Sequence, residues 1–157
     1  MELKDYQSLT KQAIALIETE KNLIANLSNL SALINLELND VNWVGFYLMD
    51  GDELVLGPFQ GKPACIRIPL GRGVCGTAVT TNQVQRIQDV HEFAGHIACD
   101  AQTNSEIVIP FSIGGKVTGV LDIDSPKLSR FSEIDEKGLV DLISKVEKVL
   151  NSQAIEV

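Results

Sequence analysis

The sequence predicts an α+β fold in which a central antiparallel sheet is flanked by N-terminal and C-terminal helices. Apolar residues recur at helical spacing over 1–38 and again over 132–150. Between them, over 41–125, strand-like runs are separated by short glycine-containing turns, which favour antiparallel hairpins. A chain of 157 residues has the length of about one domain and is large enough to bury a core. We therefore expect a single domain over 1–157.

The N-terminal part of the chain predicts two helices. Helical spacing of apolar residues runs from about Asp5 to Leu38, and the polar residues Ser28, Asn29 and Ser31 interrupt it. We therefore expect the first helix to end, and the second to begin, near these polar residues. The apolar stripe consists of Leu9, Ala13, Ile14, Leu16, Ile17, Leu23, Ile24, Leu27 and Leu30.

The first half of the sheet follows these helices. The run from Trp43 to Leu48 predicts a strand, and Asp50-Gly51 predicts a hairpin turn into a second strand at Leu54–Leu56. A third strand is expected at Cys65–Ile68, ahead of a turn at Pro69–Gly73.

A short helix and a long loop come next. Gly73 opens a helix expected at Val74–Thr80, which places Cys75 near its start. Residues 82–104 predict mainly loop, with a short strand near Arg86-Ile87.

The chain is expected to close with a hairpin and a helix. Strands at Glu106–Ile113 and Lys116–Asp124 enclose the turn Gly114-Gly115. Ser132, with Asp135 three residues later, is typical of a helix N-terminus. The buried stripe predicted for this helix is Leu139, Leu142, Ile143, Val146 and Leu150.

Composition limits the classes of partner. The formal net charge of −8 argues against a nucleic-acid partner, because binding phosphates needs a basic surface. The sequence has no apolar run long enough to span a membrane, and its first residues lack the apolar region of a signal peptide. We therefore expect a cytoplasmic protein whose cysteines are reduced at rest.

The three cysteines predict thiol redox chemistry. Cys65, Cys75 and Cys99 have no CxxC spacing, which fits neither a zinc ribbon nor a thioredoxin-type pair. A zinc site built from these cysteines and His96 is disfavoured for the same reason. An odd number of cysteines is also poorly explained by one structural disulfide. The set suits a nucleophile with resolving partners that the fold brings together.

A nucleophilic cysteine needs help, because a thiol of ordinary pKa is only a few per cent thiolate at neutral pH. His96 and His91 precede Cys99 and could raise its thiolate fraction. Cys75 lies near a helix N-terminus, where the helix dipole is expected to lower the pKa of a thiol. Cys99 is our candidate nucleophile and Cys75 its main rival. The alternative for Cys75 is a small packed residue.

Three acids and two aromatic residues are candidates for a binding pocket. Asp122 and Asp124 lie two apart on one strand and share a face, while Glu106 begins the neighbouring strand. A carboxyl group held among other carboxyls has a raised pKa and can act as an acid. Trp43 and Tyr47, four apart on a strand, also share a face. The alternatives are solvated strand ends for the acids and core packing for the aromatics.

The motifs VNWVGFYL, LVLGPFQGKPAC, IPLGRGVCGTA, DVHEFAGHIACD, NSEIVIP and GVLDIDSP together resemble a GAF domain. More narrowly, the chain resembles the free methionine-(R)-sulfoxide reductases, which are stand-alone GAF proteins. The resemblance covers nearly the whole chain and is tightest from Trp43 to Phe131. The cysteine spacings of ten and twenty-four positions agree as well. Ala94 departs from the family, which usually has proline there.

The resemblance implies reduction of free L-methionine (R)-sulfoxide to methionine. Cys99 would attack the sulfoxide and become a sulfenic acid, and Cys65 or Cys75 would condense with it to a disulfide. Thioredoxin would reduce that disulfide, and no metal or organic cofactor is implied. A homodimer formed through the terminal helices is a further expectation from the family.

The resemblance also assigns the pocket residues. Glu106, Asp122 and Asp124 would bind the substrate ammonium and polarise the sulfoxide oxygen, with the division between them left open. Trp43 and Tyr47 would hold the apolar methylthio end.

Two other functions compete with this one. A non-enzymatic GAF module could sense a small ligand such as a cyclic nucleotide, or a redox sensor could use the same disulfide without turnover. The Gly71-Arg72-Gly73 turn lacks either glycine-rich nucleotide-binding pattern. We also expect the chain to end about where the domain ends, which would leave a sensor without an effector region.

Overall fold

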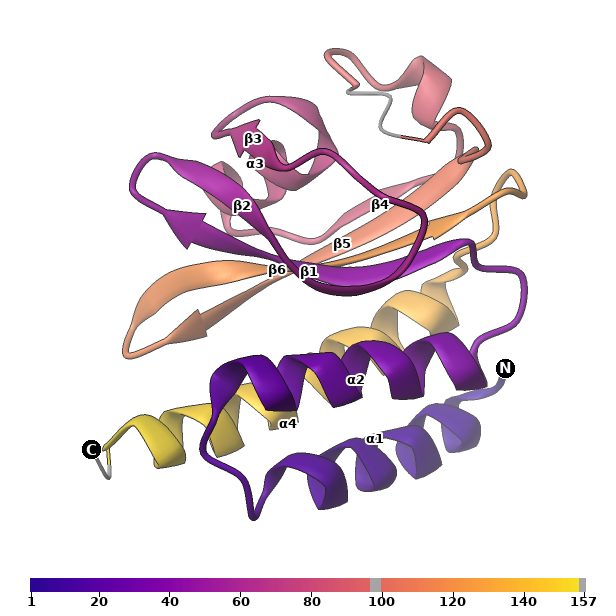
Figure 1. Ribbon diagram of the computed structural model, residues 1–157. Coiled ribbons are helices and arrows are strands. Elements are labelled where there is room, and N and C mark those ends of the chain that lie inside the picture. The colour runs from indigo at the N-terminus through magenta and orange to yellow at the C-terminus, as the bar shows by residue number, and fades with distance from the viewer. Residues whose placement is uncertain (97–99, 156–157) are drawn as a thin grey trace.

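A single antiparallel sheet organises the computed structural model, which describes residues 1–96 and 100–155. Its strand order is β3-β2-β1-β6-β5-β4 (Figure 1). The strands are β1 (Trp43–Asp50), β2 (Glu53–Gly61), β3 (Arg67–Pro69), β4 (Gln85–Ile87), β5 (Ser105–Ile113) and β6 (Lys116–Ser125). The predicted α+β class with a central antiparallel sheet is confirmed.

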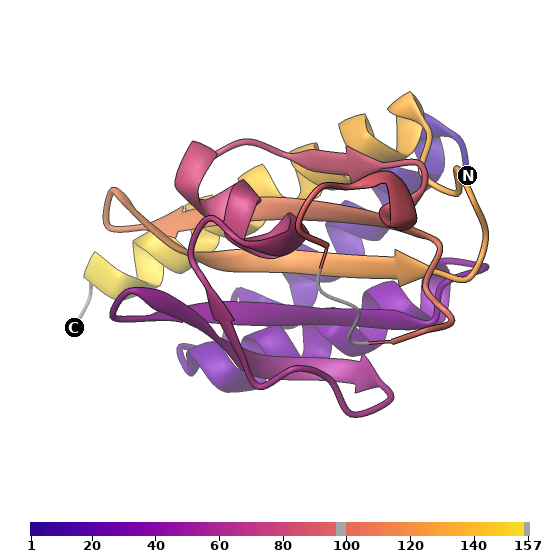
Figure 2. The same cartoon turned by 90° about the horizontal axis from the view of Figure 1, so that it is seen from above.

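The helices divide between the two faces of the sheet. On one face, α2 (Leu23–Glu37) contacts β1 and β2, and α4 (Glu133–Ile155) contacts β5. Helix α1 (Leu3–Ile17) packs against α2 and α4 from outside and forms a further layer (Figure 1). The short helix α3 (Gly73–Thr81) lies over the opposite face, as the view from above also shows (Figure 2). Within the described ranges, no helix is both long enough and apolar enough to cross a membrane.

The predicted break between the first two helices is wrong. The helices separate at residues 18–22, and Ser28 and Ser31 lie inside α2. Each serine hydroxyl donates to the carbonyl four residues earlier, at 2.7 and 2.8 Å, so these polar residues are accommodated within the helix. The helix begins instead after Asn22, whose side chain accepts a hydrogen bond from the Ala25 N–H at 2.9 Å.

Two further boundaries differ from those expected. Strand β3 begins at Arg67, so Cys65 precedes the strand instead of starting it. Its pairing with β2 covers Arg67 to Pro69, and the carbonyl of the preceding residue, Ile66, accepts a further hydrogen bond from the Leu56 N–H at 2.8 Å. Helix α4 begins with the predicted capping box, in which Ser132 and Asp135 exchange hydrogen bonds, but it continues to Ile155, beyond the predicted end.

Two apolar clusters lie on the two faces of the sheet. Alternate residues of β1 separate between them, so that Val44 and Phe46 pack towards the helices while Trp43 and Tyr47 face the other way. The cluster towards the helices includes the whole stripe predicted for α4. The smaller cluster, on the side of α3, contains Cys75 and surrounds the pocket described below.

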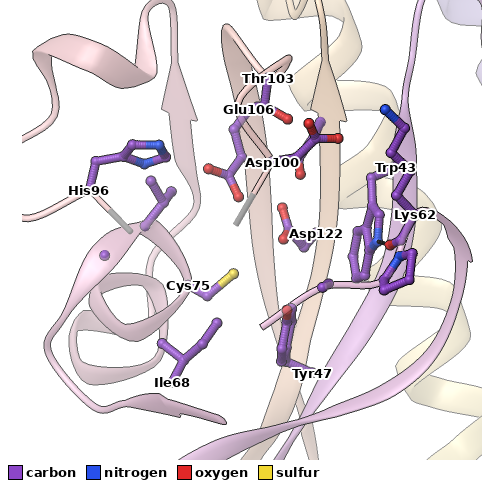
Figure 3. Close-up of a pocket in the computed structure, with 15 residues that line it drawn as sticks. Trp43, Tyr47, Lys62, Ile68, Cys75, His96, Asp100, Thr103, Glu106 and Asp122 are labelled. Carbon is purple, nitrogen blue, oxygen red and sulfur yellow. Dashed lines mark hydrogen bonds between the residues drawn. The ribbon is translucent and has the colours of Figure 1, made fainter. Parts of the chain in front are cut away.

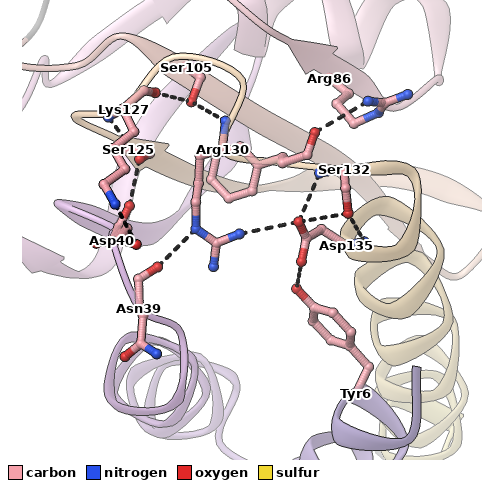
Figure 4. A network of polar contacts seen from close by, with 11 residues as sticks. Tyr6, Asn39, Asp40, Arg86, Ser105, Ser125, Lys127, Arg130, Ser132 and Asp135 are labelled. Atoms are coloured by element: carbon pink, nitrogen blue, oxygen red, sulfur yellow. Dashed lines mark hydrogen bonds and ion pairs between the residues drawn. The ribbon is translucent and has the colours of Figure 1, made fainter. Parts of the chain in front are cut away.

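A polar network holds the segment that follows β6. The Asp135 carboxylate accepts hydrogen bonds from the Tyr6 hydroxyl at 2.5 Å and from Arg130 at 3.2 Å (Figure 4). Arg130 also donates to the carbonyl of Asn39. Burial would raise the pKa of Asp135, but hydrogen bonds from Ser132 and Tyr6 outweigh it and lower that pKa. These contacts join α1, α4 and the connection between α2 and β1, beside the end of β6 that carries the acidic residues.

Candidate active site

A pocket lies on the face of the sheet covered by α3 (Figure 3). Its floor comes from β1, β5 and β6, and its walls come from α3 and from residues 62–64. The predicted pocket residues that line it are Trp43, Tyr47, Cys75, Glu106, Asp122 and Asp124. The structure therefore brings together residues that lie up to 81 positions apart in the chain.

Strand register places the three acids side by side. Asp124 pairs with Glu106 on one side and with Trp43 on the other, which forms a row across three strands. Asp122 lies one pleat further along β6, opposite Gly45. This confirms that Asp122 and Asp124 share a face. Gly45 carries no side chain, and a Cβ there would lie 2.7 Å from the Trp43 ring, so the glycine makes room for the indole.

The three carboxyl groups hold their protons unusually tightly. Glu106 and Asp122 are only 7% and 5% exposed, and burial raises the pKa of each well above its ordinary value. Burial and the charge of Glu106 raise the pKa of Asp124 in the same way. One oxygen each of Asp122 and Asp124 is buried without a hydrogen-bond partner. The pocket is therefore suited to a ligand that brings a cation and hydrogen-bonding groups.

Cys75 is a buried free thiol at the start of α3. Burial raises its pKa well above the usual value, and the charges of Asp122, Glu106 and Asp124 raise it further. The expectation that the helix N-terminus lowers this pKa is therefore wrong, since burial and three nearby acids outweigh the dipole. Cys75 is favoured as a neutral thiol.

Three donor atoms in the pocket are close enough to share a metal ion. Single ligand atoms of Cys75, Glu106 and Asp122 all lie within 4.8 Å of one another. A metal would require the thiol to lose its proton, and the raised pKa values of the three groups oppose that loss. The zinc set considered from sequence included Cys99, which lies outside the described residues.

The aromatic residues form a wall on one side of the pocket. The rings of Trp43 and Tyr47 stack with centroids 5.8 Å apart, and Phe59 stacks on Trp43 at 5.1 Å. Trp43 and Tyr47 are 3% and 2% exposed. The two rings belong to the smaller core and also line the pocket. Phe59, which the sequence did not indicate, packs on Trp43 and is not among the residues that line the pocket.

Loop residues that the sequence did not single out complete the rim. Lys62, Asp100 and Thr103 line the pocket. The Asn42 amide donates to Asp100 and to Thr103, at 3.1 Å each, and ties this loop to the start of β1. Lys62 and Asp100 lie inside the cysteine-flanking motifs GKPAC and ACD, which is the signal that could have identified them.

One of the two predicted histidines reaches the pocket. His96 is half-buried and lines it, whereas His91 is exposed, with the two ring centroids 6.4 Å apart. Burial and the charge of His91 lower the pKa of His96, so the neutral imidazole is favoured. Cys65 is half-buried beside the pocket, where Pro63 and Ala64 line the wall. Cys99, the predicted nucleophile, lies outside the described residues.

The fold and the pocket together indicate the class of domain. Three helices cover one face of the sheet, and a short helix covers a pocket on the other face. A family model of the GAF domain matches residues 29–150, which include every strand and α3. The protein is a GAF-domain protein.

Comparison with individual proteins narrows the class. The chain is 58% identical over 145 residues to the free methionine-R-sulfoxide reductase of Escherichia coli strain K12, covering 92% of this chain and 88% of the relative. It is 43% identical to the Saccharomyces cerevisiae protein of the same name, with 89% and 80% covered. A solved structure of the Neisseria meningitidis enzyme in complex with its substrate superposes with a TM-score of 0.92 at 41% identity, covering 97% of this chain and 92% of that one. The chain belongs to the free methionine-R-sulfoxide reductase family of GAF-domain proteins.

Proposed function

We propose that the protein reduces free L-methionine (R)-sulfoxide to L-methionine by cysteine chemistry, without a metal or organic cofactor. Besides membership of this family, one structural observation supports the proposal. Three carboxyl groups with raised pKa values, of which Glu106 and Asp122 are buried, face an aromatic wall across a small pocket. That arrangement complements a small zwitterion that has a cationic end and an apolar end.

The substrate fits the two sides of this pocket. Its ammonium group would pair with a carboxylate among Glu106, Asp122 and Asp124, where oxygens of Asp122 and Asp124 lack partners. Its methylthio group would lie against the rings of Trp43 and Tyr47. A carboxyl group whose pKa is raised in this way can also donate its proton to the sulfoxide oxygen.

Two cysteine thiols supply the two electrons that the proposed reduction needs. The Cys99 thiolate attacks the sulfoxide sulfur while a carboxyl group protonates the oxygen, which gives an adduct with a new S–S bond and a hydroxyl group on the substrate sulfur. The hydroxyl group then moves from the substrate sulfur to the Cys99 sulfur as the S–S bond breaks, so that methionine leaves and Cys99 becomes a sulfenic acid. The Cys65 thiolate then attacks the sulfenic sulfur. An S–S bond forms, the S–O bond breaks, and the oxygen takes a proton and leaves as water. The sulfoxide gains two electrons and the two cysteines lose them.

The surroundings of Cys75 support this division of roles. A nucleophile must be available as a thiolate, and burial beside three acids disfavours that form at Cys75. We therefore propose Cys99 as the nucleophile and Cys65 as the main resolving thiol. Cys75 remains the alternative resolving thiol.

Three wider assignments belong to the same proposal: thioredoxin as the reductant of the disulfide, a cytoplasmic location, and a homodimer. Apolar side chains exposed on the N-terminal helices support the dimer, since Leu16, Ile24 and Leu36 are 41%, 53% and 76% exposed. Sedimentation equilibrium of the reduced protein tests it, and a single species of monomer mass would contradict it.

A turnover assay separates the enzyme from the two sensor functions. The purified protein is mixed with free methionine (R)-sulfoxide, thioredoxin, thioredoxin reductase and NADPH, and both methionine formation and NADPH consumption are followed. We expect repeated turnover with one NADPH consumed per methionine. A single methionine per chain would leave a redox sensor, and no methionine at all would leave a ligand-binding module; either result contradicts the proposal.

A further inference from the structure

The two aromatic residues of the pocket have polar ends that point to a second task. The Trp43 indole N–H donates a hydrogen bond to the carbonyl of Lys62 at 3.1 Å. The Tyr47 hydroxyl donates one to the carbonyl of Cys65 at 2.9 Å. Both acceptors belong to residues 62–65, which we call the Cys65 segment. The aromatic wall therefore holds this segment at its first and last residues.

The Cys65 segment has little regular structure of its own. It lies between the end of β2 at Gly61 and the start of β3 at Arg67, in neither helix nor strand. Pro63 contributes no N–H to any backbone hydrogen bond. A segment of this kind takes its position from its contacts with neighbouring elements.

The donors are themselves held firmly. Trp43 and Tyr47 are almost completely buried, stack on each other, and stand on β1 at the centre of the sheet. Gly61 leaves space for the indole, because a Cβ at this position would lie 3.1 Å from Trp43 Cγ and 3.0 Å from the carbonyl oxygen of Asn42. Burial and the charge of Asp122 raise the pKa of Tyr47, so its hydroxyl remains a donor at neutral pH.

We propose that Trp43 and Tyr47 are positioning residues for Cys65, acting through these two hydrogen bonds in the step that forms the disulfide. This inference rests on the proposed function, in which Cys65 resolves the sulfenic acid. The rings serve the first step by contacting the substrate, and the polar ends serve the second step by holding the resolving cysteine. One pair of side chains thus acts in both halves of the reaction.

The two tasks can be separated by Tyr47→Phe, which keeps the ring and removes only the hydroxyl. The reduced enzyme is mixed with one equivalent of free methionine (R)-sulfoxide and no reductant. Methionine is measured over time, and dimedone is used to trap the sulfenic acid before the disulfide forms. Because Tyr47 also contacts the substrate, the rates of the two steps are compared within the variant. We expect disulfide formation to slow about tenfold more than methionine release, the size expected for losing one part-buried hydrogen bond. Trapped sulfenic acid should accumulate accordingly.

Tyr6→Phe is the matched control. It removes the hydroxyl of another buried tyrosine, which bonds Asp135 in the helix layer away from the pocket. Both rates should be unchanged in this variant. If Tyr47→Phe does not fold, Trp43→Phe removes the other donor, keeps an aromatic ring, and should slow disulfide formation more than methionine release.

The outcomes distinguish the two proposals. Unchanged disulfide formation in Tyr47→Phe, or slowing of both steps by the same factor, would overturn the positioning role while leaving the reductase activity intact. Absence of methionine from the wild-type enzyme would overturn the proposed function itself.

Discussion

At the scale of residues, the proposed mechanism gives the three cysteines separate roles. Cys99→Ser removes the atom that attacks sulfur, so we expect no methionine in a single turnover without reductant. Cys65→Ser should release nearly one methionine per chain but recycle slowly with thioredoxin, because the sulfenic acid lacks its main resolving partner. Rapid quenching and quantification of methionine per chain checks both. Should Cys99→Ser still yield one methionine per chain, the nucleophile would be another residue and Cys75 would be tested next.

Cys75 gives a second prediction at this scale. Because its thiol is buried and its pKa is raised, it should react slowly with iodoacetamide in the folded, reduced protein. Mass spectrometry of alkylated peptides measures this, with the same protein in denaturant as the reference. Alkylation of Cys75 at the denatured rate would contradict the burial and charge described for this residue.

The sequence predicted which residues gather in the pocket better than it predicted their chemistry. Glu106, Asp122 and Asp124 could be placed together because side-chain alternation and the closing hairpin determine their faces. The pKa of Cys75 could not be predicted, since it depends on acids 31 to 49 positions away that fold against α3. Lys62 and Asp100 were missed because loop residues carry no periodicity.

At the scale of elements, close packing of α1 on α4 makes Gly138 sensitive to substitution. A Cβ at this position would overlap the Tyr6 side chain, whose hydroxyl is held by Asp135. Alanine improves helix propensity by about 1 kcal/mol, but overpacking a core costs about 1–3 kcal/mol. Tyr6 cannot move aside without losing its hydrogen bond, so we expect Gly138→Ala to lose about 1–2 kcal/mol of unfolding free energy.

Urea denaturation measures this loss. Ser144→Ala, at an exposed position of the same helix, is the control and should change stability little. Equal or greater stability of Gly138→Ala would show that α1 and α4 are less closely packed than described.

Element boundaries were the least predictable part of the fold. The existence of the hairpins and the capping of α4 followed from local signals at Asp50-Gly51, Gly114-Gly115 and Ser132. The break between α1 and α2 did not, because serine hydroxyls that bond back to helix carbonyls look like a break in the sequence.

At the scale of the whole molecule, the three acids of the pocket should make stability fall as pH rises. Glu106, Asp122 and Asp124 have pKa values raised by folding, so the folded state binds more protons than the unfolded state above the unfolded pKa. Their stabilising contribution is complete below that pKa and is lost as pH rises through the folded values. We therefore expect the unfolding free energy to decrease as pH rises above the ordinary carboxyl pKa of the unfolded chain towards the raised pKa values of the folded state.

Asp122→Asn tests whether these acids cause the decrease of the unfolding free energy with pH. Removing one of the titrating groups should flatten the decrease, so that the variant gains stability relative to wild type as pH rises. Asp141→Asn, at a half-exposed ion pair on α4, is the control and should keep the wild-type slope. If the unfolding free energy of wild type and of Asp122→Asn changed with pH in parallel, Asp122 would not be a source of the pH dependence.

The most direct test of the account compares free methionine (R)-sulfoxide with its N-acetyl derivative. Acetylation removes the charge that the carboxylates would bind and leaves a buried carboxylate unpaired, which costs about 2–5 kcal/mol, or roughly thirtyfold or more in binding. We predict that kcat/KM for the N-acetyl compound is lower by at least this factor, while the sulfoxide group is the same in both. Comparable kcat/KM values for the two compounds would contradict the proposed role of Glu106, Asp122 and Asp124 in selecting the free amino acid.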